Sequence, residues 1–437
     1  MKVLVVGPGA REHALVRSLA TDPGVTGLFA APGNPGIAGL IGERNCFAVD
    51  ALDPAAVTGL AGELGADLVV VGPEAPLVAG VSDAVRAAGI PCFGPSAAAA
   101  RLEGSKAFAK DVMAAAGVPT GESATCATLD EVREALVRFG APHVVKDDGL
   151  AAGKGVVVTD DPEAALAHAA ACLEREGARV VIEEFLDGPE VSLFCVTDGV
   201  TVLPLEPAQD FKRALDGDLG PNTGGMGAYS PLPWAPEGLV DEVLERVARP
   251  TVAEMARRGA PFVGVLYCGL ALTSRGVKVI EFNARFGDPE TQVVLARLAT
   301  PLGMLLRAAA VQHLEHVPEL EWHEKAAVTV VLASENYPDT PVKGDVLTGV
   351  DEAGSRPDAW VLHAGTAVED GKLVAAGGRV LSVVGTGADL TAARTAVYGA
   401  LEQIGLRGGQ FRTDIAEAAA AADLTERLAH PVAPGES

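Results

Sequence analysis

Three features are scarce in this sequence: aromatic residues, paired cysteines and long apolar runs. Only 4% of the 437 residues are aromatic, so a folded core must consist mainly of Ala, Val and Leu. The six cysteines form no CxxC pair and no Cys/His metal spacing, which favours free thiols in a reducing compartment. The opening stretch Met1–Val6 is too short for a signal peptide, and no apolar run reaches the length of a membrane span. We therefore expect a cytoplasmic protein without a membrane partner.

Positive charge is also in short supply. The chain has 34 Lys and Arg against 58 Asp and Glu, for a formal net charge of −24. This surplus of negative charge argues against a protein that binds nucleic acid or an anionic membrane surface. The length is enough for about three domains with large cores of their own.

The N-terminal quarter of the chain alternates short apolar segments with Ala-rich helical ones. This alternation predicts an α/β domain with a doubly wound parallel sheet. The expected strands are Val3–Val6, Leu28–Ala30, Leu68–Val71 and Pro91–Phe93, and the expected helices are Arg11–Ala20, Asp53–Leu64 and Leu77–Ala88.

The middle of the chain predicts a small α+β lobe and then a β-hairpin. A helix over 106–116 should end at Gly117, and Thr128 and Glu131 have the spacing of a capping box, with a helix to Phe139. Another helix should begin at Asp161-Pro162. The expected lobe strands are His143–Lys146, Val156–Thr159 and Val180–Phe185, and the hairpin joins Val263–Leu272 to Val277–Phe282.

The last part of the chain predicts one helix and a small β-rich domain. The helix should lie around Thr291–Gln312. The domain should contain strands Ala327–Leu332, Val361–Thr366 and Arg379–Val384, a helix Leu390–Gln403 and a frayed tail, His430–Ser437.

A glycine-rich turn, Gly7-Pro8-Gly9-Ala10-Arg11-Glu12-His13, directly follows the first strand. A dinucleotide-binding fingerprint requires glycine where this chain has Glu12, so the pattern argues against an NAD enzyme. Backbone N–H groups of the turn and the start of the following helix can still bind a phosphate. A tight turn of purely structural value is the alternative.

A second glycine-rich segment runs from Lys146 to Gly155. It lacks the spacing and the Ser or Thr of a Walker A loop, which excludes a P-loop kinase. A strand lysine, three glycines and Lys154 nevertheless suit a lid over a polyphosphate, because glycines allow close approach and lysines supply charge. An ordinary flexible hairpin is the alternative.

The segment from Glu281 to Glu290 predicts a metal site. Glu281 and Asn283 lie two apart on a strand and therefore share one face, opposite Phe282. Two oxygen ligands with room for phosphate oxygens suit Mg²⁺. Any half-exposed strand alternates in this way, but the crowding of Arg285, Asp288 and Glu290 into the next loop favours a ligand site.

Two further segments are candidates for binding. The first is Glu183-Glu184-Phe185-Leu186, a strand end whose backbone could read an adenine edge, with Leu186 against the ring and Glu190 near the ribose hydroxyls. The second is Gln209–Arg213 together with Gly220–Tyr229, a glycine run without helical or strand period that we interpret as a binding loop.

These motifs together closely resemble one family, the phosphoribosylamine–glycine ligases of the ATP-grasp superfamily. The resemblance extends in order over essentially the whole chain, and the segments Gly220–Pro231 and Glu281–Thr291 are its most specific parts. It implies three domains: an N-terminal substrate domain (1–102), an ATP-grasp domain (103–326) with a mobile lobe (119–188), and a C-terminal domain (327–428).

The resemblance also implies the reaction. Such enzymes join glycine to 5-phosphoribosylamine and cleave ATP to ADP and phosphate, through a glycyl phosphate, in purine synthesis. The partners would be these small molecules only, the cofactors ATP and Mg²⁺ or Mn²⁺, and the protein a monomer. Chemistry of this kind needs positioning and neutralised charge more than a protein nucleophile.

Site residues follow from the same resemblance. Lys106, Lys146 and the loop containing Gly153, Lys154 and Gly155 would contact ATP phosphates, Glu183–Leu186 the adenine, and Glu190 the ribose. Glu281 and Asn283 would bind the metal. Arg285, Asp210, Lys212 and Asp288 would act on the substrate side of the reaction. Phosphoribosylamine would be held by Gly9, Arg11, Glu12, Asn34 and Glu74, and Asn222 and Gly224 would also bind substrate.

Three departures and three rivals accompany this hypothesis. Ala10 replaces an expected glycine, Asp147 places a negative charge beside Lys146, and Gly269–Leu272 lacks the third metal acid of many ATP-grasp enzymes. The nearest rival is a related ATP-grasp carboxylate–amine ligase with another substrate. An NAD-dependent oxidoreductase and a nucleotide-binding regulator without catalysis are the others.

Overall fold

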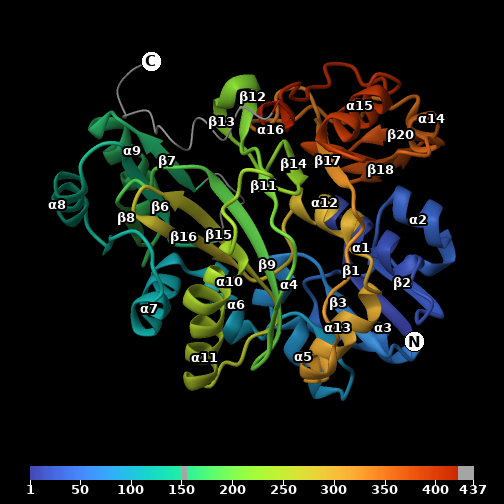
Figure 1. Ribbon diagram of the computed structural model, residues 1–437, viewed down its shortest axis with the longest axis horizontal. Helices are drawn as coiled ribbons and strands as arrows, with labels where there is room; N and C mark the ends of the chain where they lie inside the picture. The colour runs from blue at the N-terminus through green and yellow to red at the C-terminus, as the bar shows by residue number, and fades with distance from the viewer. Residues whose placement is uncertain (150–154, 422–437) are drawn as a thin grey trace.

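The computed structural model describes residues 1–149 and 155–421, and Figure 1 shows their arrangement. Gly153, Lys154 and the tail His430–Ser437 lie outside the described residues. In Figure 1 a lobe formed by α8, α9 and β6–β8 projects on the left, and the C-terminal strands lie at the upper right. Among the described helices, none is long and apolar enough to cross a membrane.

The N-terminal part contains the predicted parallel sheet. Its strands are β1 (Lys2–Gly7), β2 (Gly27–Pro32), β3 (Leu68–Val71) and β4 (Cys92–Phe93), in the order β2-β1-β3-β4. The chain crosses β1 on its way from β2 to β3, so the sheet is doubly wound and the carboxyl end of β1 opens onto a crevice. Helices α1 (Ala10–Ala20), α2 (Pro35–Ile41) and α3 (Pro54–Leu64) connect the strands.

Two predicted helices are each divided in two. The predicted helix Leu77–Ala88 is α4 (Glu74–Val78) and α5 (Val81–Ala87), because Gly80 takes a positive φ of 87° between them. The predicted helix Thr291–Gln312 is α12 (Glu290–Arg297) and α13 (Leu302–Ala310), because Pro301 cannot continue the first helix. Both predictions were wrong about continuity.

The central part contains two antiparallel sheets. The larger has the order β10-β9-β15-β16, with β9 (Glu190–Asp198), β10 (Val202–Pro204), β15 (Val263–Thr273) and β16 (Gly276–Asn283). The β15–β16 pair is the predicted hairpin. Helices α6 (Ala97–Gly104) and α7 (Lys106–Ala116) precede this part, and α7 ends as predicted at Gly117, which takes a φ of 68°. Helices α10 (Leu239–Val243) and α11 (Arg249–Arg257) lie between β14 and β15.

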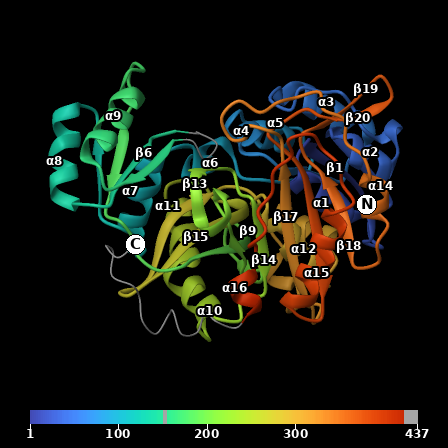
Figure 2. The same ribbon diagram turned by 90° about the horizontal axis from the view of Figure 1, so that it is seen from above.

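The lobe is the smaller antiparallel unit. Its sheet has the order β5-β8-β6-β7, with strands Ser123–Cys126, Val180–Glu183, His143–Asp147 and Val156–Thr159, covered by α8 (Leu129–Phe139) and α9 (Pro162–Leu173). The capping box of α8 is confirmed. A separate cluster of buried side chains, including Val132, Val145 and Ile182, forms the lobe's own core. Figure 2 shows the lobe at the opposite end of the molecule from the C-terminal strands.

The C-terminal sheet is built from two distant parts of the chain. Its order is β11-β14-β17-β21-β18, where β17 (Ala326–Ala333), β18 (Ala359–His363) and β21 (Arg379–Gly387) come from the C-terminal part. Strands β11 (Gln209–Asp210) and β14 (Gly227–Ser230) complete it. The remaining elements are β12 (Arg213–Leu215), β13 (Leu219–Asn222), β19 (Thr366–Glu369), β20 (Lys372–Ala375), α14 (Val350–Gly354), α15 (Leu390–Leu401) and α16 (Glu417–Ala420).

The prediction that the glycine run forms no strand was therefore wrong at both ends. Only 223–226 lies between β13 and β14 without regular structure. Glycines carry no side chain whose alternation would show a strand, and β14 forms because its backbone pairs with β17, about a hundred residues away.

A pair of buried histidines joins the N-terminal and C-terminal parts. The backbone N–H of His363 donates to Nδ1 of His13 at 2.9 Å, and the two rings lie 5.8 Å apart. Gly36 packs over both, since a Cβ there would lie 2.5 Å from each ring. Asn34 Nδ2 donates to the carbonyls of Pro8 and His363 at 2.7 and 2.9 Å, which closes the junction.

This junction predicts acid sensitivity. Burial, with smaller contributions from His363 and Arg17, lowers the pKa of His13 to about 3. The folded protein therefore holds His13 neutral while the unfolded chain takes up a proton below about pH 6.5, so stability is lost as the pH falls toward 3. We expect His13 to lower the free energy of unfolding by about 2 kcal/mol between about pH 6.5 and about pH 5.

Denaturant unfolding at several pH values checks this expectation. His13→Asn should reduce the slope of stability against pH, whereas His316→Asn, at an exposed histidine, should leave it unchanged. Equal slopes for the wild type and His13→Asn would contradict the assignment.

Candidate active site

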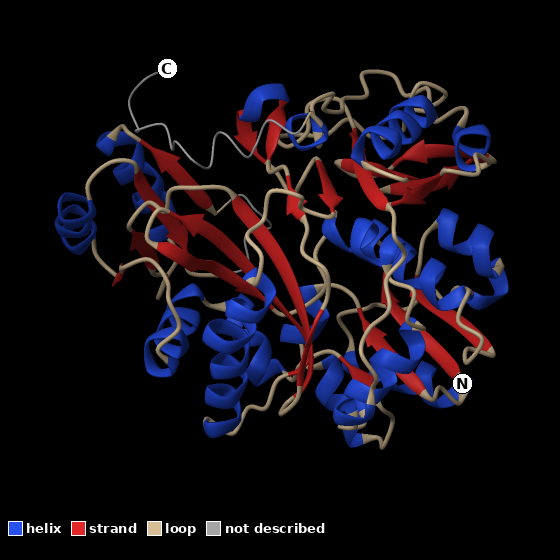
Figure 3. Ribbon diagram, in the orientation of Figure 1, coloured by secondary structure: helices blue, strands red, loops and turns tan. Residues whose placement is uncertain are grey.

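The candidate site lies where the lobe sheet meets the large sheet. Figure 3, with strands in red, shows the two sheets next to each other. Lys146 of β6 donates from Nζ to the carbonyl of Ile280 of β16 at 3.3 Å, and the backbone N–H of Val279 donates to Pro119 at 2.8 Å. The end of β16, which carries Glu281 and Asn283, therefore faces the lobe.

Glu281 is the electrostatic centre of the site. Burial by itself would raise the pKa of this carboxyl, but Lys146, Lys212, Lys106 and Arg285 together lower it. No hydrogen bond to the Glu281 carboxylate comes from any described residue. The positive charges of four residues, predicted from separate motifs, thus act on one carboxylate.

The two predicted metal ligands fit the chemistry of a divalent cation. The carboxylate of Glu281 and the amide oxygen of Asn283 are hard oxygen ligands on one face of β16, while Phe282 is buried on the other. Gly269 of β15 stands opposite Glu281, and a Cβ at Gly269 would lie 3.3 Å from the Glu281 side chain. Strand β15 therefore contributes no third carboxylate to the predicted metal site at this position. Within residues 1–149 and 155–421 no group of three or more His, Cys, Asp or Glu forms a metal cluster.

Arg285 is held between two acids. Its Nη2 lies 2.8 Å from Glu103 Oε1, its Nε lies 3.3 Å from Glu74 Oε2, and Nη2 also reaches Asn283 Oδ1 at 3.5 Å. Burial raises the pKa of Glu103. For Glu74, burial is opposed by the charges of Arg285 and Arg11 and by hydrogen bonds, which together lower the pKa. Glu103 also accepts from the backbone N–H of Ala284 at 2.8 Å, which fixes the loop after β16. Sequence reasoning missed Glu103 because one glutamate at a helix end carries no pattern.

Glu12 holds the N-terminal turn together. Its Oε2 accepts from the backbone N–H of Gly9 at 2.6 Å and its Oε1 from Arg11 Nε at 2.5 Å. Gly72 leaves room for the Glu12 side chain, since a Cβ at Gly72 would lie 2.1 Å from Glu12 Oε1. Arg11 continues to the carbonyl of Phe286 at 3.1 Å, so the turn is tied to the loop after β16.

The nucleotide side of the site contains Lys106 and Lys146. Lys106 Nζ donates to the carbonyl of Gly149 at 3.0 Å, and Lys146 Nζ lies 3.1 Å from Glu183 Oε2. Gly155, at the other end of the glycine loop, accepts from the backbone N–H of Asp147 at 2.7 Å. The Asp147 carboxylate pairs with Arg175 at 2.5 Å, so the unexpected negative charge beside Lys146 is neutralised.

The segment that follows Glu183 crosses from the lobe to the large sheet in extended form. Glu184 pairs with Lys278 at 2.6 Å and Arg275 at 3.0 Å, and these cations overcome burial and lower its pKa to about 2. Phe185 is exposed and Leu186 half-buried. Among the described residues neither the Glu184 carbonyl nor the Leu186 N–H has a backbone partner, so both can serve a ligand.

Lys212 forms a second charged cluster, with two acids. Lys212 Nζ pairs with Glu190 and lies 3.4 Å from Asp210 Oδ1. Burial raises the pKa of Asp210 to about 7. The charge of Lys212 opposes this shift, and the charges of Glu290 and Glu190 add to it. Glu290 is buried behind them, hydrogen-bonded to Tyr267 and 3.4 Å from Ser192 Oγ.

The C-terminal part also reaches the site. Arg379 Nη1 donates to the carbonyls of Gly224 and Asp288 at 2.6 and 2.7 Å, and Nη2 lies 3.4 Å from Asp288 Oδ2. The backbone N–H of Gly224 donates to Tyr337 Oη at 2.9 Å. Asn222 ends β13 opposite Arg213. Arg379 and Tyr337 were missed because no motif marks them, although Arg379 follows a Gly-Gly pair and opens a predicted strand.

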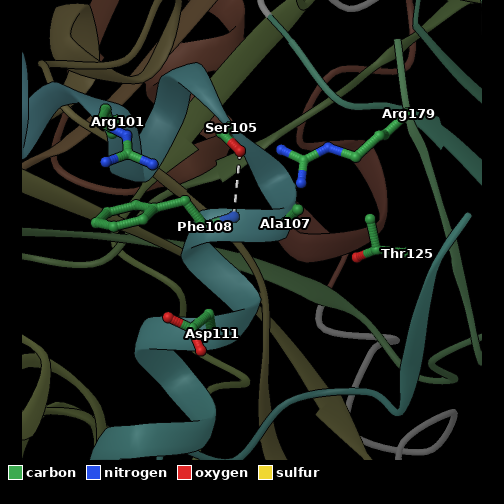
Figure 4. Close-up of a pocket in the computed structure, with 7 residues that line it drawn as sticks. All are labelled: Arg101, Ser105, Ala107, Phe108, Asp111, Thr125 and Arg179. Atoms are coloured by element: carbon green, nitrogen blue, oxygen red, sulfur yellow. Dashed lines mark hydrogen bonds between the residues drawn. The ribbon is translucent and has the colours of Figure 1, made fainter. Parts of the chain in front are cut away.

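One surface cavity of about 320 Å³ is lined by residues of α6, of α7 and of the lobe (Figure 4). Several of its polar groups already have partners: Ser105 Oγ accepts from the backbone N–H of Phe108 at 3.1 Å, and Arg179 pairs with Asp148 at 3.0 Å. Arg101 lies over the ring of Phe108, and Asp111 pairs with Arg258. We therefore place the candidate site at Glu281 and not in this cavity.

The protein has a doubly wound N-terminal domain, a lobe and a large sheet that meet around lysines, an arginine and a carboxylate, and a C-terminal sheet. This combination defines an ATP-grasp enzyme, a class that uses ATP with a divalent metal ion. The chain belongs to the phosphoribosylglycinamide synthetase family. It matches the family's N domain over residues 1–103, its ATP-grasp (A) domain over 104–291 and its C domain over 327–418. The predicted resemblance and three-domain fold are confirmed.

Individual relatives agree with this assignment. A phosphoribosylamine–glycine ligase of Streptomyces coelicolor is 69% identical over 97% of this chain and 100% of its own length. One of Mycobacterium tuberculosis strain H37Rv is 58% identical over 95% of this chain and 97% of its own. The crystal structure of the Thermotoga maritima phosphoribosylamine–glycine ligase shares 32% identity and a TM-score of 0.80, covering 95% of this chain and 100% of that one.

A likeness of fold alone extends further. The biotin carboxylase domain of a Hydrogenobacter thermophilus 2-oxoglutarate carboxylase, solved with MgADP and bicarbonate, has a TM-score of 0.70 at 16% identity. It covers 94% of this chain and 91% of that one.

Proposed function

We propose that this protein joins glycine to 5-phosphoribosylamine, cleaving ATP to ADP and phosphate and forming glycinamide ribonucleotide for purine synthesis. The observation that carries the proposal is the convergence of Lys106, Lys146, Lys212 and Arg285 on Glu281. Relatives that match nearly the whole chain bear the name of this activity. We also propose that the protein acts as a monomer in the cytoplasm, and the six free cysteines support a reducing compartment.

The reaction needs two displacements and no protein nucleophile. A glycine carboxylate oxygen attacks the γ-phosphorus, ADP leaves, and glycyl phosphate forms. The amine of phosphoribosylamine then attacks the acyl carbon, phosphate leaves, and a proton is lost from nitrogen. Both steps move negative charge, so the protein contributes mainly position and fixed positive charge.

The nucleotide would lie between the lobe and the large sheet. Lys106, Lys146 and the loop that ends at Gly155 would bind its phosphates. The free Glu184 carbonyl and Leu186 N–H would pair with the adenine edge, and Glu190 with the ribose. Glu281 and Asn283 would hold a divalent cation, Mg²⁺ or Mn²⁺, which neutralises phosphate charge when bound.

The reacting groups would lie on the N-terminal side of Glu281. Arg285, held rigidly by Glu74 and Glu103, would stabilise charge on the acyl phosphate. Asp210 would accept the proton of the attacking amine, since its pKa near neutrality suits a general base. Lys212 and Asp288 would orient the substrates beside it.

Phosphoribosylamine would bind at the junction of the domains. Gly9 and Arg11 in the N-terminal turn, together with Asn34, would face its phosphate and sugar. Glu12 would act by holding that turn, and Asn222 and Gly224 would close the other side.

An ADP-release assay tests the proposal. With ATP, Mg²⁺, phosphoribosylamine and glycine all present, we expect steady ADP formation that stops when either glycine or phosphoribosylamine is left out. Turnover without glycine would contradict the proposal. Turnover with another carboxylate or amine in place of these substrates would favour the related ATP-grasp ligase.

A further inference from the structure

Lys110 is a buried lysine that the proposed reaction does not use. It lies on α7, and its side chain is only 9% exposed. Its Nζ lies 3.1 Å from Glu183 Oε2, donates to Thr120 Oγ1 at 2.9 Å and donates to the carbonyl of Gly121 at 3.2 Å. Burial lowers the pKa of this ammonium, and the charge of Glu183 opposes that shift.

Glu183 is shared equally by two lysines. The same oxygen, Oε2, lies 3.1 Å from Lys110 Nζ and 3.1 Å from Lys146 Nζ, and the Glu183 side chain is 3% exposed. The three side chains carry a net charge of +1, two ammonium groups against one carboxylate. Without Lys110, Glu183 would pair with Lys146 alone and cancel its charge.

Lys110 also touches both places where the chain crosses between the lobe and the rest of the molecule. The chain enters the lobe next to Thr120 and Gly121 and leaves it after Glu183. Thr120 is itself fixed to β16, since its Oγ1 donates to the carbonyl of Val279 at 2.6 Å. One ammonium group therefore links the two crossings and the strand that carries Glu281.

We propose that Lys110 is a positioning residue for ATP: by sharing the Glu183 carboxylate, it leaves Lys146 with a free positive charge for the nucleotide phosphates. The inference rests on the proposed phosphate-binding role of Lys146. It concerns nucleotide binding only, so it can be tested without glycine or phosphoribosylamine, and its failure is distinct from failure of the ligase activity.

Titration of the full-length protein with MgATP, followed by calorimetry, gives the test. Lys110→Met makes the cluster neutral, and we expect ATP to bind about 10-fold more weakly. A double variant, Lys110→Met with Glu183→Gln, restores the net charge of +1 and leaves no buried unpaired acid. Its ATP affinity should therefore return to within about 3-fold of wild type. A lysine that only braced the crossings would predict a double variant no better than the single one.

Lys278→Met is the matched control. It removes an ion pair with Glu184, the neighbouring carboxylate at the same crossing, at a site that does not touch Lys146. We expect its ATP affinity to stay within about 2-fold of wild type. If Lys110→Met does not fold, the double variant and Lys110→Arg decide the question, because both keep the charge. Near wild-type ATP binding by both supports the proposal, and wild-type binding by Lys110→Met, or weak binding by the double variant, overturns it.

Discussion

Replacing Glu281 with glutamine is expected to reduce kcat by at least about 100-fold while the fold is retained. The carboxylate is the group on which four cations converge, and among the described residues it accepts no hydrogen bond that the amide would break. A neutral amide binds a divalent cation more weakly than a carboxylate does, and the substitution removes one negative charge from among the four cations. Initial rates at saturating substrates, with and without added Mg²⁺ or Mn²⁺, measure the effect.

Glu245→Gln is the control for this variant. Glu245 pairs with Arg249 on the surface of the molecule, so its loss should leave kcat unchanged and affect stability by less than about 1 kcal/mol. Wild-type turnover by Glu281→Gln would show that the metal lies elsewhere.

Replacing Arg285 with methionine is expected to abolish turnover and to destabilise the protein by about 3 kcal/mol. Arg285 is the ionic partner of Glu103, whose side chain is 8% exposed, and removing the guanidinium would leave that carboxylate buried and unpaired. Glu74 is 29% exposed and can turn to water. Thermal unfolding and the ADP-release assay on the same samples give the two quantities.

A second substitution separates stability from catalysis. Adding Glu103→Gln to Arg285→Met removes the unpaired acid, so the unfolding temperature should recover while turnover should not. Arg257→Met, which removes an arginine that is 70% exposed, should change neither. Recovery of turnover in the double variant would mean that Arg285 serves the fold and not the reaction.

Local pattern was sufficient for much of the fold. The alternation of apolar and helical segments predicted the parallel N-terminal sheet, because parallel strands that are buried on both faces consist of short runs of apolar residues. Capping signals predicted where α7 ends and α8 begins. Pattern failed where one residue interrupts a helix, as at Gly80 and Pro301, and where a four-residue strand directly follows a glycine run, as β14 does.

The candidate site divides in the same way. Glu281, Asn283 and Arg285 could be found from sequence, since they share one strand and its following loop, where spacing determines which side chains share a face. Lys110, Glu103, Arg379 and Tyr337 could not, since each enters the site through a partner far away in the chain.

By itself the sequence determined the family and the order of the domains, because these depend on motifs that are local in the chain. Only the tertiary structure decided how charge is shared. A lysine on α7 and a carboxylate on β8 are separated by 73 residues yet lie 3.1 Å apart. Likewise, the acidic surplus says nothing about the local cluster of cations around Glu281. Electrostatic interactions depend on distance and burial, and both arise only when the chain folds.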